Sequence, residues 1–128
     1  MPFVYDTSAL LASVFSEPGG DAVVDLAVGH GGLMSAVNWA ECASKLADQG
    51  YPKARVEFEL KQFGLEVVSL TAGLALQAGL LRPSTRTLGL SLGDRCCLAL
   101  AASLADATVV TADKAWAKVP GFNFRFIR

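Results

Sequence analysis

The chain of 128 residues contains few charged side chains and no large excess of either sign. Charged residues make up 18% of it, and the formal net charge is −1. Proteins that bind nucleic acid through their overall charge are strongly basic, so this composition excludes a global basic surface. Any binding of nucleic acid must therefore use local patches of positive charge.

Histidine and cysteine are scarce as well. The chain has one histidine, His30, and three cysteines: Cys42, Cys96 and Cys97. No two of the cysteines have the spacing of a zinc-binding pair, which argues against a Cys-based zinc site. We interpret them as small buried residues of a protein in the reducing cytoplasm. His30 lies in a glycine-rich stretch, where a solvated turn residue is more common than a catalyst.

Long hydrophobic runs are absent too. The longest apolar stretch, Cys96 to Ala105, is about half the length that a membrane-spanning helix needs, and it includes Ser103. The amino-terminal segment lacks the basic start of a signal peptide, and Asp6 interrupts its apolar residues. We therefore predict a cytoplasmic protein that is not associated with a membrane.

What the chain has in abundance is apolar side chains, which make up 52% of its residues. This content fits a sheet that is covered on both faces, or a surface patch that needs a partner. The length predicts a single domain over residues 1–128, large enough to bury a substantial core.

Short runs of β-forming residues alternate with helical patterns along the chain. The predicted strands are Phe3–Tyr5, Leu33–Val37, Leu65–Ser69, Thr108–Thr111 and Asn123–Ile127. The predicted helices are Ser8–Phe15, Asp21–Val28, Trp39–Gln49, Lys53–Phe63, Ala72–Leu81, Asp94–Leu104 and Lys114–Ala117. The stretch between Arg82 and Gly93 is the least regular, and we expect a loop there. This alternation predicts a three-layer α/β/α sandwich around a mainly parallel sheet.

Four acidic residues stand where a predicted strand has just ended or a predicted helix has just begun: Asp6, Glu41, Asp94 and Asp113. Ligands of open parallel α/β sheets bind beyond the carboxyl ends of the strands. These four side chains can therefore converge at one edge of the sheet.

Helix capping is the alternative explanation for each acid taken singly. Asn38 with Glu41, and Ser91 with Asp94, have the spacing of a capping box. Two like charges about 4 Å apart repel by on the order of 4 kcal/mol at an effective dielectric near 20, whereas a cap contributes only about 1 kcal/mol. Crowding four carboxylates for capping alone is therefore unfavourable. A bound divalent cation would attract all four carboxylates and so turn the unfavourable electrostatic energy of the cluster into a favourable one. A donor set of oxygens alone favours Mg²⁺ or Mn²⁺ over zinc.

Three stretches that contain these acids resemble the PIN-domain nucleases, specifically the VapC-type toxins of bacterial toxin–antitoxin pairs. They are VYDTSALLASVFSEPGG, SAVNWAECASKL and LSLGDRCCLALAASLADATVVTADKAW. The resemblance covers nearly the whole chain in order. It implies a PIN-like α/β fold, cleavage of RNA with Mg²⁺ or Mn²⁺, a homodimer, and inhibition by a cognate VapB-type antitoxin.

The resemblance also implies roles for individual residues. Asp6, Glu41, Asp94 and Asp113 match the acidic quartet of the family, which implies that they are catalytic and bind the metal. Ser8 and Thr111 match hydroxyl residues beside the first and last acids, and we expect them to orient carboxylates. Some relatives have a further acid just after the fourth. Lys114, Ala115 and Trp116 occupy those positions here, so Asp113 could bind metal through water instead of directly.

Basic and aromatic residues near the acids are candidates for binding RNA. Arg82, Arg86 and Arg95 lie in or beside the irregular stretch and could contact phosphates, although a solvated loop is an equal alternative. Trp39 and Trp116 flank two of the acids and could stack on an unpaired base, with packing in the interior favoured for Trp39.

Together these features predict a metal-dependent endoribonuclease that acts as the toxin of a toxin–antitoxin pair. A bound cation would activate a water for in-line attack on phosphorus. The alternative is a degenerate, non-catalytic PIN domain that binds RNA or a protein. A phosphatase-like or nucleotide-binding enzyme is a weaker interpretation. The chain has no phosphate-cradling glycine loop, and no Asp-x-Asp pair follows the first strand.

Overall fold

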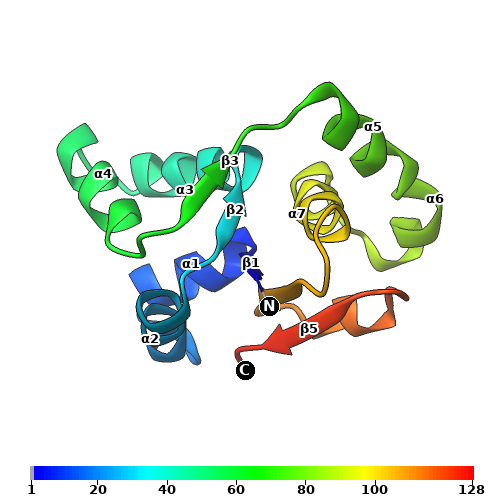
Figure 1. The fold of residues 1–128 in the computed structure, drawn as a ribbon. Helices are drawn as coiled ribbons and strands as arrows, with labels where there is room; N and C mark the ends of the chain where they lie inside the picture. The colour runs from blue at the N-terminus through cyan, green and yellow to red at the C-terminus, as the bar shows by residue number, and fades with distance from the viewer. Residues whose placement is uncertain (1) are drawn as a thin grey trace.

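The computed structural model of the protein describes residues 2–128 and has a five-stranded sheet at its centre (Figure 1). Its strands are β1 (Phe3–Tyr5), β2 (Leu33–Ser35), β3 (Glu66–Val68), β4 (Thr108–Thr111) and β5 (Asn123–Phe126). They lie in the order β3-β2-β1-β4-β5, and every neighbouring pair is parallel. The first strand of the chain is therefore the central strand of the sheet.

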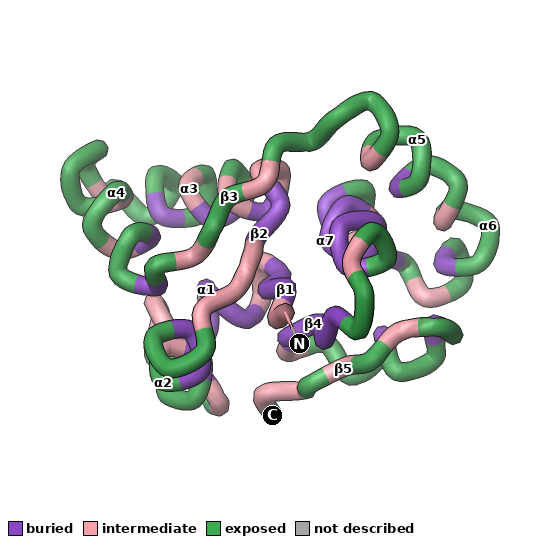
Figure 2. Tube along the Cα trace, in the orientation of Figure 1, coloured by how far each residue is buried: buried purple, intermediate pink, exposed green. Residues whose placement is uncertain are grey.

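Helices cover both faces of the sheet (Figures 1 and 2). One face carries α1 (Thr7–Val14), α2 (Gly20–His30), α3 (Ala36–Asp48) and α4 (Lys53–Lys61). The other face carries α7 (Leu92–Ala102), against which α5 (Ala72–Leu80) packs, and the 3₁₀ helix η2 (Lys114–Lys118). The three-layer α/β/α fold with a parallel sheet, predicted from the sequence, is confirmed.

Alternation along the two central strands explains why both faces need a helical cover. Tyr5 of β1 and Val110 of β4 pack on the side of α1–α4. Their neighbours Val4 and Val109 pack on the side of α7. Successive strand residues point to opposite faces, and all four side chains are fully buried. The high apolar content of the chain thus serves a core that is divided by the sheet.

The predicted start of α3 is wrong. The sequence favoured Asn38 as its cap, but the helix begins at Ala36 because the hydroxyl of Ser35 accepts a hydrogen bond from the amide of Val37 (3.2 Å). β2 accordingly ends at Ser35. Asn38 lies inside the first turn of α3 and is fully buried. Its side chain is therefore free to contact something other than the helix terminus.

The expected loop between Arg82 and Gly93 is also partly wrong. It contains a short helix, α6 (Arg82–Thr85), and a 3₁₀ turn, η1 (Arg86–Leu88), and α7 begins before it ends. Pro83 suits the first turn of α6, where a missing amide hydrogen costs nothing. The hydroxyl of Thr85 donates to the carbonyl of Leu81 (2.8 Å), which stabilises this turn. The remaining predicted elements are present, with ends that differ by a few residues.

None of the helices in residues 2–128 combines the length and the apolar character that crossing a bilayer requires.

Candidate active site

Asp6 follows the last residue of the central strand and begins α1. Only 3% of it is exposed. Its Oδ1 accepts hydrogen bonds from the amide of Ala9 (3.0 Å) and the hydroxyl of Ser8 (2.7 Å). Its Oδ2 accepts one from the hydroxyl of Thr111 (2.9 Å). Asp6 is thus the cap of α1, as the alternative explanation predicted, but capping uses only one of its three hydrogen bonds.

The hydroxyls of Ser8 and Thr111 connect the ends of β1 and β4. Their oxygens lie 3.3 Å apart. Ser8 also accepts a hydrogen bond from the amide of Ala112 (3.0 Å), and Thr111 accepts one from the amide of Asp113 (3.1 Å). These bonds hold the turn after β4 against the start of α1, and they fix the direction of the Asp6 carboxylate.

The buried carboxylate of Asp6 is electrostatically unfavourable. Burial raises the pKa of Asp6 from 3.8 to about 7. The hydrogen bonds from Ser8, Ala9 and Thr111 oppose this shift, whereas the nearby Asp94 carboxylate adds to it. The four ion pairs found in residues 2–128 involve none of the four acids. Within that part of the chain, no Lys or Arg neutralises the charge.

Glu41 is held by contacts from three different helices. Its Oε1 accepts hydrogen bonds from the hydroxyl of Thr7 (2.6 Å) in α1 and from the side-chain amide of Asn38 (3.0 Å) in α3. The carboxyl group also lies against Gly93 in α7, so closely that a β-carbon at that position would overlap with it. The first turn of α7 therefore needs glycine where it faces Glu41.

Asp94 is the third residue of α7 and forms a capping box with Ser91, as predicted. The amide of Ser91 donates to the Asp94 carboxylate (2.9 Å), and the amide of Asp94 donates to the Ser91 hydroxyl (3.1 Å). Partial burial raises the pKa of Asp94, and the charges of Glu41 and Asp113 act in the same direction. The hydrogen bonds with Ser91 oppose the shift. Asp94 is therefore linked by charge to each of the other three acids. Glu41 and Asp113 raise its pKa, and its own charge raises the pKa of Asp6.

Asp113 lies after β4, exposed to solvent, and caps η2. Its Oδ1 accepts a hydrogen bond from the amide of Ala115 (3.0 Å). The second oxygen of its carboxylate is not used by this cap. The pKa of Asp94 is raised mainly by burial, and the charges of Glu41 and Asp113 add smaller contributions in the same direction.

The charge of Asp94 acts on Asp6, and the charges of Glu41 and Asp113 act on Asp94, yet the four acids do not form a ready-made metal cage. Across residues 2–128, no three Asp, Glu, His or Cys side chains approach one another closely enough to hold an ion. The physical reason is that like charges repel and each acid is held by donors of its own, among them Thr7, Ala9, Asn38 and Ser91. The donor set fits a hard divalent cation in chemistry, since it consists of oxygens alone.

A family model for the PIN domain matches residues 3–121, which is nearly the whole chain. The chain belongs to the PIN domain family. The resemblance noted in its sequence is thereby confirmed. Among curated proteins, none matches this chain at a significant level.

Solved structures with this PIN fold include three that match almost the full length of both chains. One is DNA-bound VapBC from Salmonella typhimurium, with a TM-score of 0.75, 16% identity, and 100% and 99% of the two chains covered. Another is a toxin–antitoxin complex from Klebsiella pneumoniae, with a TM-score of 0.72, 19% identity, and 98% and 97% covered. A third is VapBC2 from Rickettsia felis bound to a promoter DNA fragment, with a TM-score of 0.70, 20% identity, and 98% of each chain covered. At these identities the likeness concerns the fold.

The three arginines predicted to contact RNA differ in their surroundings. Arg82 and Arg86 are exposed on α6 and η1. Arg95 is half-buried, and its Nη1 donates to the carbonyl of Ala78 in α5 (3.1 Å). Arg95 thus connects α7 to α5 in this PIN domain, while the other two side chains are accessible to a ligand.

The prediction that Trp116 could stack on a base is wrong. It is 1% exposed and packs edge-on against Phe124, with ring centroids 6.4 Å apart. Trp39 is half-buried and packs against the core under α1–α4, as favoured from the sequence. His30 is exposed at the end of α2, beside the ring of Phe3. No aromatic side chain named from the sequence is thus available as an open stacking platform beside Asp113.

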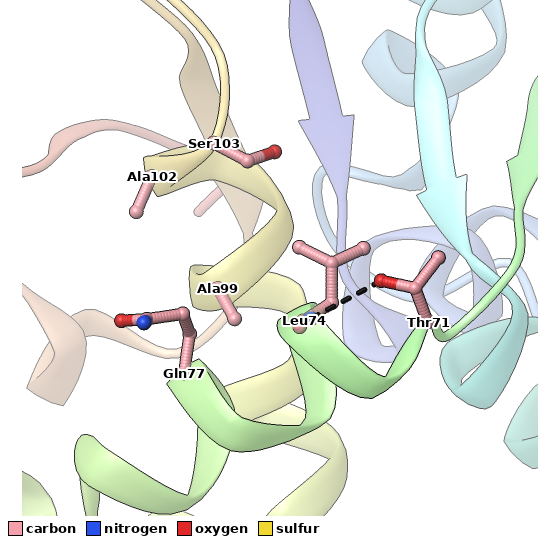
Figure 3. A pocket seen from close by; sticks show the side chains of 7 residues that line it. Thr71, Leu74, Gln77, Ala99, Ala102 and Ser103 are labelled. Carbon is pink, nitrogen blue, oxygen red and sulfur yellow. Dashed lines mark hydrogen bonds between the residues drawn. The ribbon is translucent and has the colours of Figure 1, made fainter.

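A separate hollow of about 520 Å³ lies between α5 and α7 (Figure 3). None of the four acids lines it. Its labelled lining residues are Thr71, Leu74, Gln77, Ala99, Ala102 and Ser103. Thr71 is engaged as the cap of α5, where it accepts a hydrogen bond from the amide of Leu74 (3.2 Å). We interpret the hollow as a gap left by small side chains between two helices, because no charged group faces it.

Three residues that matter at this site were missed from the sequence: Thr7, Asn38 and Gly93. The sequence contained one weak indication for each of them, namely its position relative to an acid. Thr7 is adjacent to an acid, Gly93 is adjacent to another, and Asn38 lies one helical turn before Glu41.

The raised pKa of Asp6 predicts how stability depends on pH in metal-free protein. Between pH 4 and 7 the folded state holds a proton on Asp6 that the unfolded state has lost, so stability should fall as pH rises through this window. A pKa of about 7 in place of 3.8 corresponds to a loss on the order of 4 kcal/mol. Urea unfolding from pH 4 to 8 in the presence of chelator measures this slope.

Asp6→Asn should make that slope shallower and should be more stable than the wild type at pH 8, because it keeps the shape and removes the charge. A variant with the wild-type slope would show that Asp6 is not the group responsible.

Proposed function

We propose that the protein is a Mg²⁺- or Mn²⁺-dependent endoribonuclease and the toxin of a toxin–antitoxin pair. One observation carries the proposal. In a PIN domain, a carboxylate with almost no exposure stands at the end of the central strand, three donors orient it, and no cation pairs with it in the described chain. Such an arrangement is unfavourable by itself and becomes favourable when a divalent ion binds.

Asp6, Glu41, Asp94 and Asp113 would hold the ion, directly or through water. When bound, the metal supplies Lewis-acid activation of a water and of the phosphodiester. The protein itself supplies orientation. Ser8 and Thr111 keep both oxygens of Asp6 in fixed directions, and the capping box restrains Asp94. Carboxylates now held apart would be drawn together by the cation.

The lack of a preformed cluster in residues 2–128 favours the second candidate, a non-catalytic PIN domain that binds RNA or a protein. The two candidates differ in one measurable respect, because only the nuclease cleaves RNA in a metal-dependent way.

Purified protein should cleave total RNA with Mg²⁺ or Mn²⁺, and Asp6→Asn should reduce the rate by more than the roughly 10–100-fold loss typical of changes around metal ligands. Asp48→Asn is the matched control, because Asp48 is exposed at the far end of α3. Gel analysis with and without chelator provides the measurement. Equal cleavage by the Asp6 variant, or cleavage that survives chelator, would leave the binding module as the better interpretation.

An antitoxin is the expected protein partner, and the similar solved structures support this proposal because they are toxin–antitoxin complexes. Helices α1–α4 and the residue that follows α1 carry exposed or half-exposed apolar side chains on which a partner's helix or tail could lie. They include Leu11, Val14, Phe15, Val28, Trp39 and Phe58. A basic residue of the partner would be attracted to the neighbouring acids, which have no cation of their own.

If a basic residue of the antitoxin inserts among the acids, replacing that residue with alanine should restore cleavage more than it weakens the complex. The test is to purify the protein with the product of its neighbouring gene and to replace the basic residues of its tail one at a time. A nuclease that stays silent in every intact complex would show that inhibition is purely steric.

A homodimer is the expected assembly of the toxin. Leu76 and Leu80 of α5 are 61% and 63% exposed and lie one helical turn apart, so they form an uncharged apolar face. Such a face favours burial against a second copy.

The double change Leu76→Glu and Leu80→Glu should convert a dimer into a monomer, because it places charges in the apolar interface. Light scattering across a concentration series measures the mass. Val28→Glu is the control, since Val28 is slightly more exposed, at 70%, but lies on α2. A wild-type protein that is monomeric at every concentration would contradict the proposed dimer.

A further inference from the structure

The two oxygens of the Glu41 carboxylate have different environments. Oε1 accepts both of the hydrogen bonds that the described chain makes to this group, from Thr7 at 2.6 Å and from Asn38 at 3.0 Å. Oε2 accepts none within residues 2–128. It is the oxygen that lies nearest to the Gly93 position of α7. The network thus uses one oxygen as an anchor and leaves the other with its lone pairs free.

Asn38 is the centre of this network. It is fully buried, and its side-chain nitrogen lies within hydrogen-bond distance of three oxygens on three helices. They are Oε1 of Glu41 (3.0 Å), the carbonyl of Gly93 (3.1 Å) and the hydroxyl of Thr7 (3.3 Å). The carboxylate and the carbonyl can only accept, so the amide must point its nitrogen toward them. Asn38 therefore ties the helix that carries Glu41 to the residue before Asp94.

The other end of the Asn38 amide is not satisfied. Its Oδ1 is buried and has no hydrogen-bond partner. An unsatisfied buried acceptor is unfavourable, and an apolar residue of the same shape would avoid it. The unsatisfied oxygen thus gives no reason for an amide at this position. The reason lies in the amide nitrogen, which donates to groups on three helices, Glu41 among them.

We propose that Asn38 and Thr7 are positioning residues for the metal site. They hold Oε1 of Glu41 in place and leave Oε2 free to bind an ion, and they set the distance between Glu41 and the first turn of α7, which carries Asp94. This inference rests on the proposed function. It adds two residues that neither the acidic pattern nor the predicted roles of Ser8 and Thr111 indicated.

The close packing against Gly93 restricts the positions that the Glu41 carboxylate can take. The carboxylate already fills the space that a β-carbon would take at that position. Without the hydrogen bonds from Thr7 and Asn38, the side chain can relax away from α7, and repulsion from Asp94 favours that movement. The expected effect of losing a donor is therefore weaker metal binding with the ligand itself still present.

Thr7 offers a matched pair of substitutions. Thr7→Val removes the hydroxyl and keeps the shape, whereas Thr7→Ser keeps the hydroxyl. Calorimetric titration with MnCl₂ alone should give a dissociation constant about 10-fold higher for Thr7→Val, the size typical of changes to the partners of a ligand. Thr7→Ser should stay within about threefold of the wild type. Asn38→Leu, which removes the amide at similar volume, should weaken binding as much as Thr7→Val or more.

Thr85→Val controls for a general loss of structure. Thr85 is also fully buried, and its hydroxyl donates to backbone carbonyls of α6 and the residue before it without contacting any of the four acids. This variant should bind Mn²⁺ as the wild type does. Thermal unfolding without metal shows whether each variant is folded.

A second measurement separates positioning from damage. The Mn²⁺ concentration that gives half-maximal RNA cleavage should rise about 10-fold for Thr7→Val, and excess Mn²⁺ should restore the rate to within a few-fold of the wild type. Damage to the fold would lower the rate at every concentration. If Thr7→Val and Asn38→Leu are folded and bind Mn²⁺ with wild-type affinity, the inference is wrong and the proposed nuclease stands. If wild-type protein does not bind Mn²⁺, both fail.

Discussion

The carboxylate of Asp6, buried at the end of the central strand, is the interaction on which the rest of the site depends. Burying a charge is costly, and this one has donors but no counter-charge in the described chain. The same group starts α1, and its two hydroxyl partners connect β1 to β4. The hydroxyls that orient Asp6 therefore also hold the turn after β4 in place.

Further negative charges that form no ion pair within residues 2–128 lie near Asp6, and their mutual repulsion is unfavourable for the folded protein. Three more acids approach from α3, α7 and the turn after β4, and each is restrained by short local bonds instead of by an ion pair. Local restraints keep like charges oriented but do not remove their repulsion. Such an arrangement destabilises the free protein, and a bound ligand of opposite charge removes the destabilisation. This is characteristic of binding sites, where residues are selected for function at the expense of stability.

Much of this could be predicted from the sequence, because the signals were local. The strands, the parallel sheet and the positions of Asp6, Asp94 and Asp113 at element boundaries follow from periodicity and breakers. Glu41 differs, because α3 begins earlier than predicted and this acid lies in its second turn. What could not be predicted depended on contacts between distant segments. Asn38 has the spacing of a cap, and only the approach of α7 shows that its amide bonds Gly93 and Glu41 instead. Trp116 looked available beside an acid because nothing local indicated that it packs against Phe124.

The order of the strands has a consequence for the newly made chain. Asp6 and Glu41 are synthesised before the long crossover from β3 at one side of the sheet to β4 beyond the centre, whereas Asp94 lies within that crossover, on α7, and Asp113 follows it. A ribosome-bound chain that has not yet released β4 lacks one of the two strands that pair with its central strand and the Thr111 hydroxyl that orients Asp6. The complete site can therefore form only after the chain has emerged from the ribosome as far as Asp113, well after the segment that carries Asp6 and Glu41.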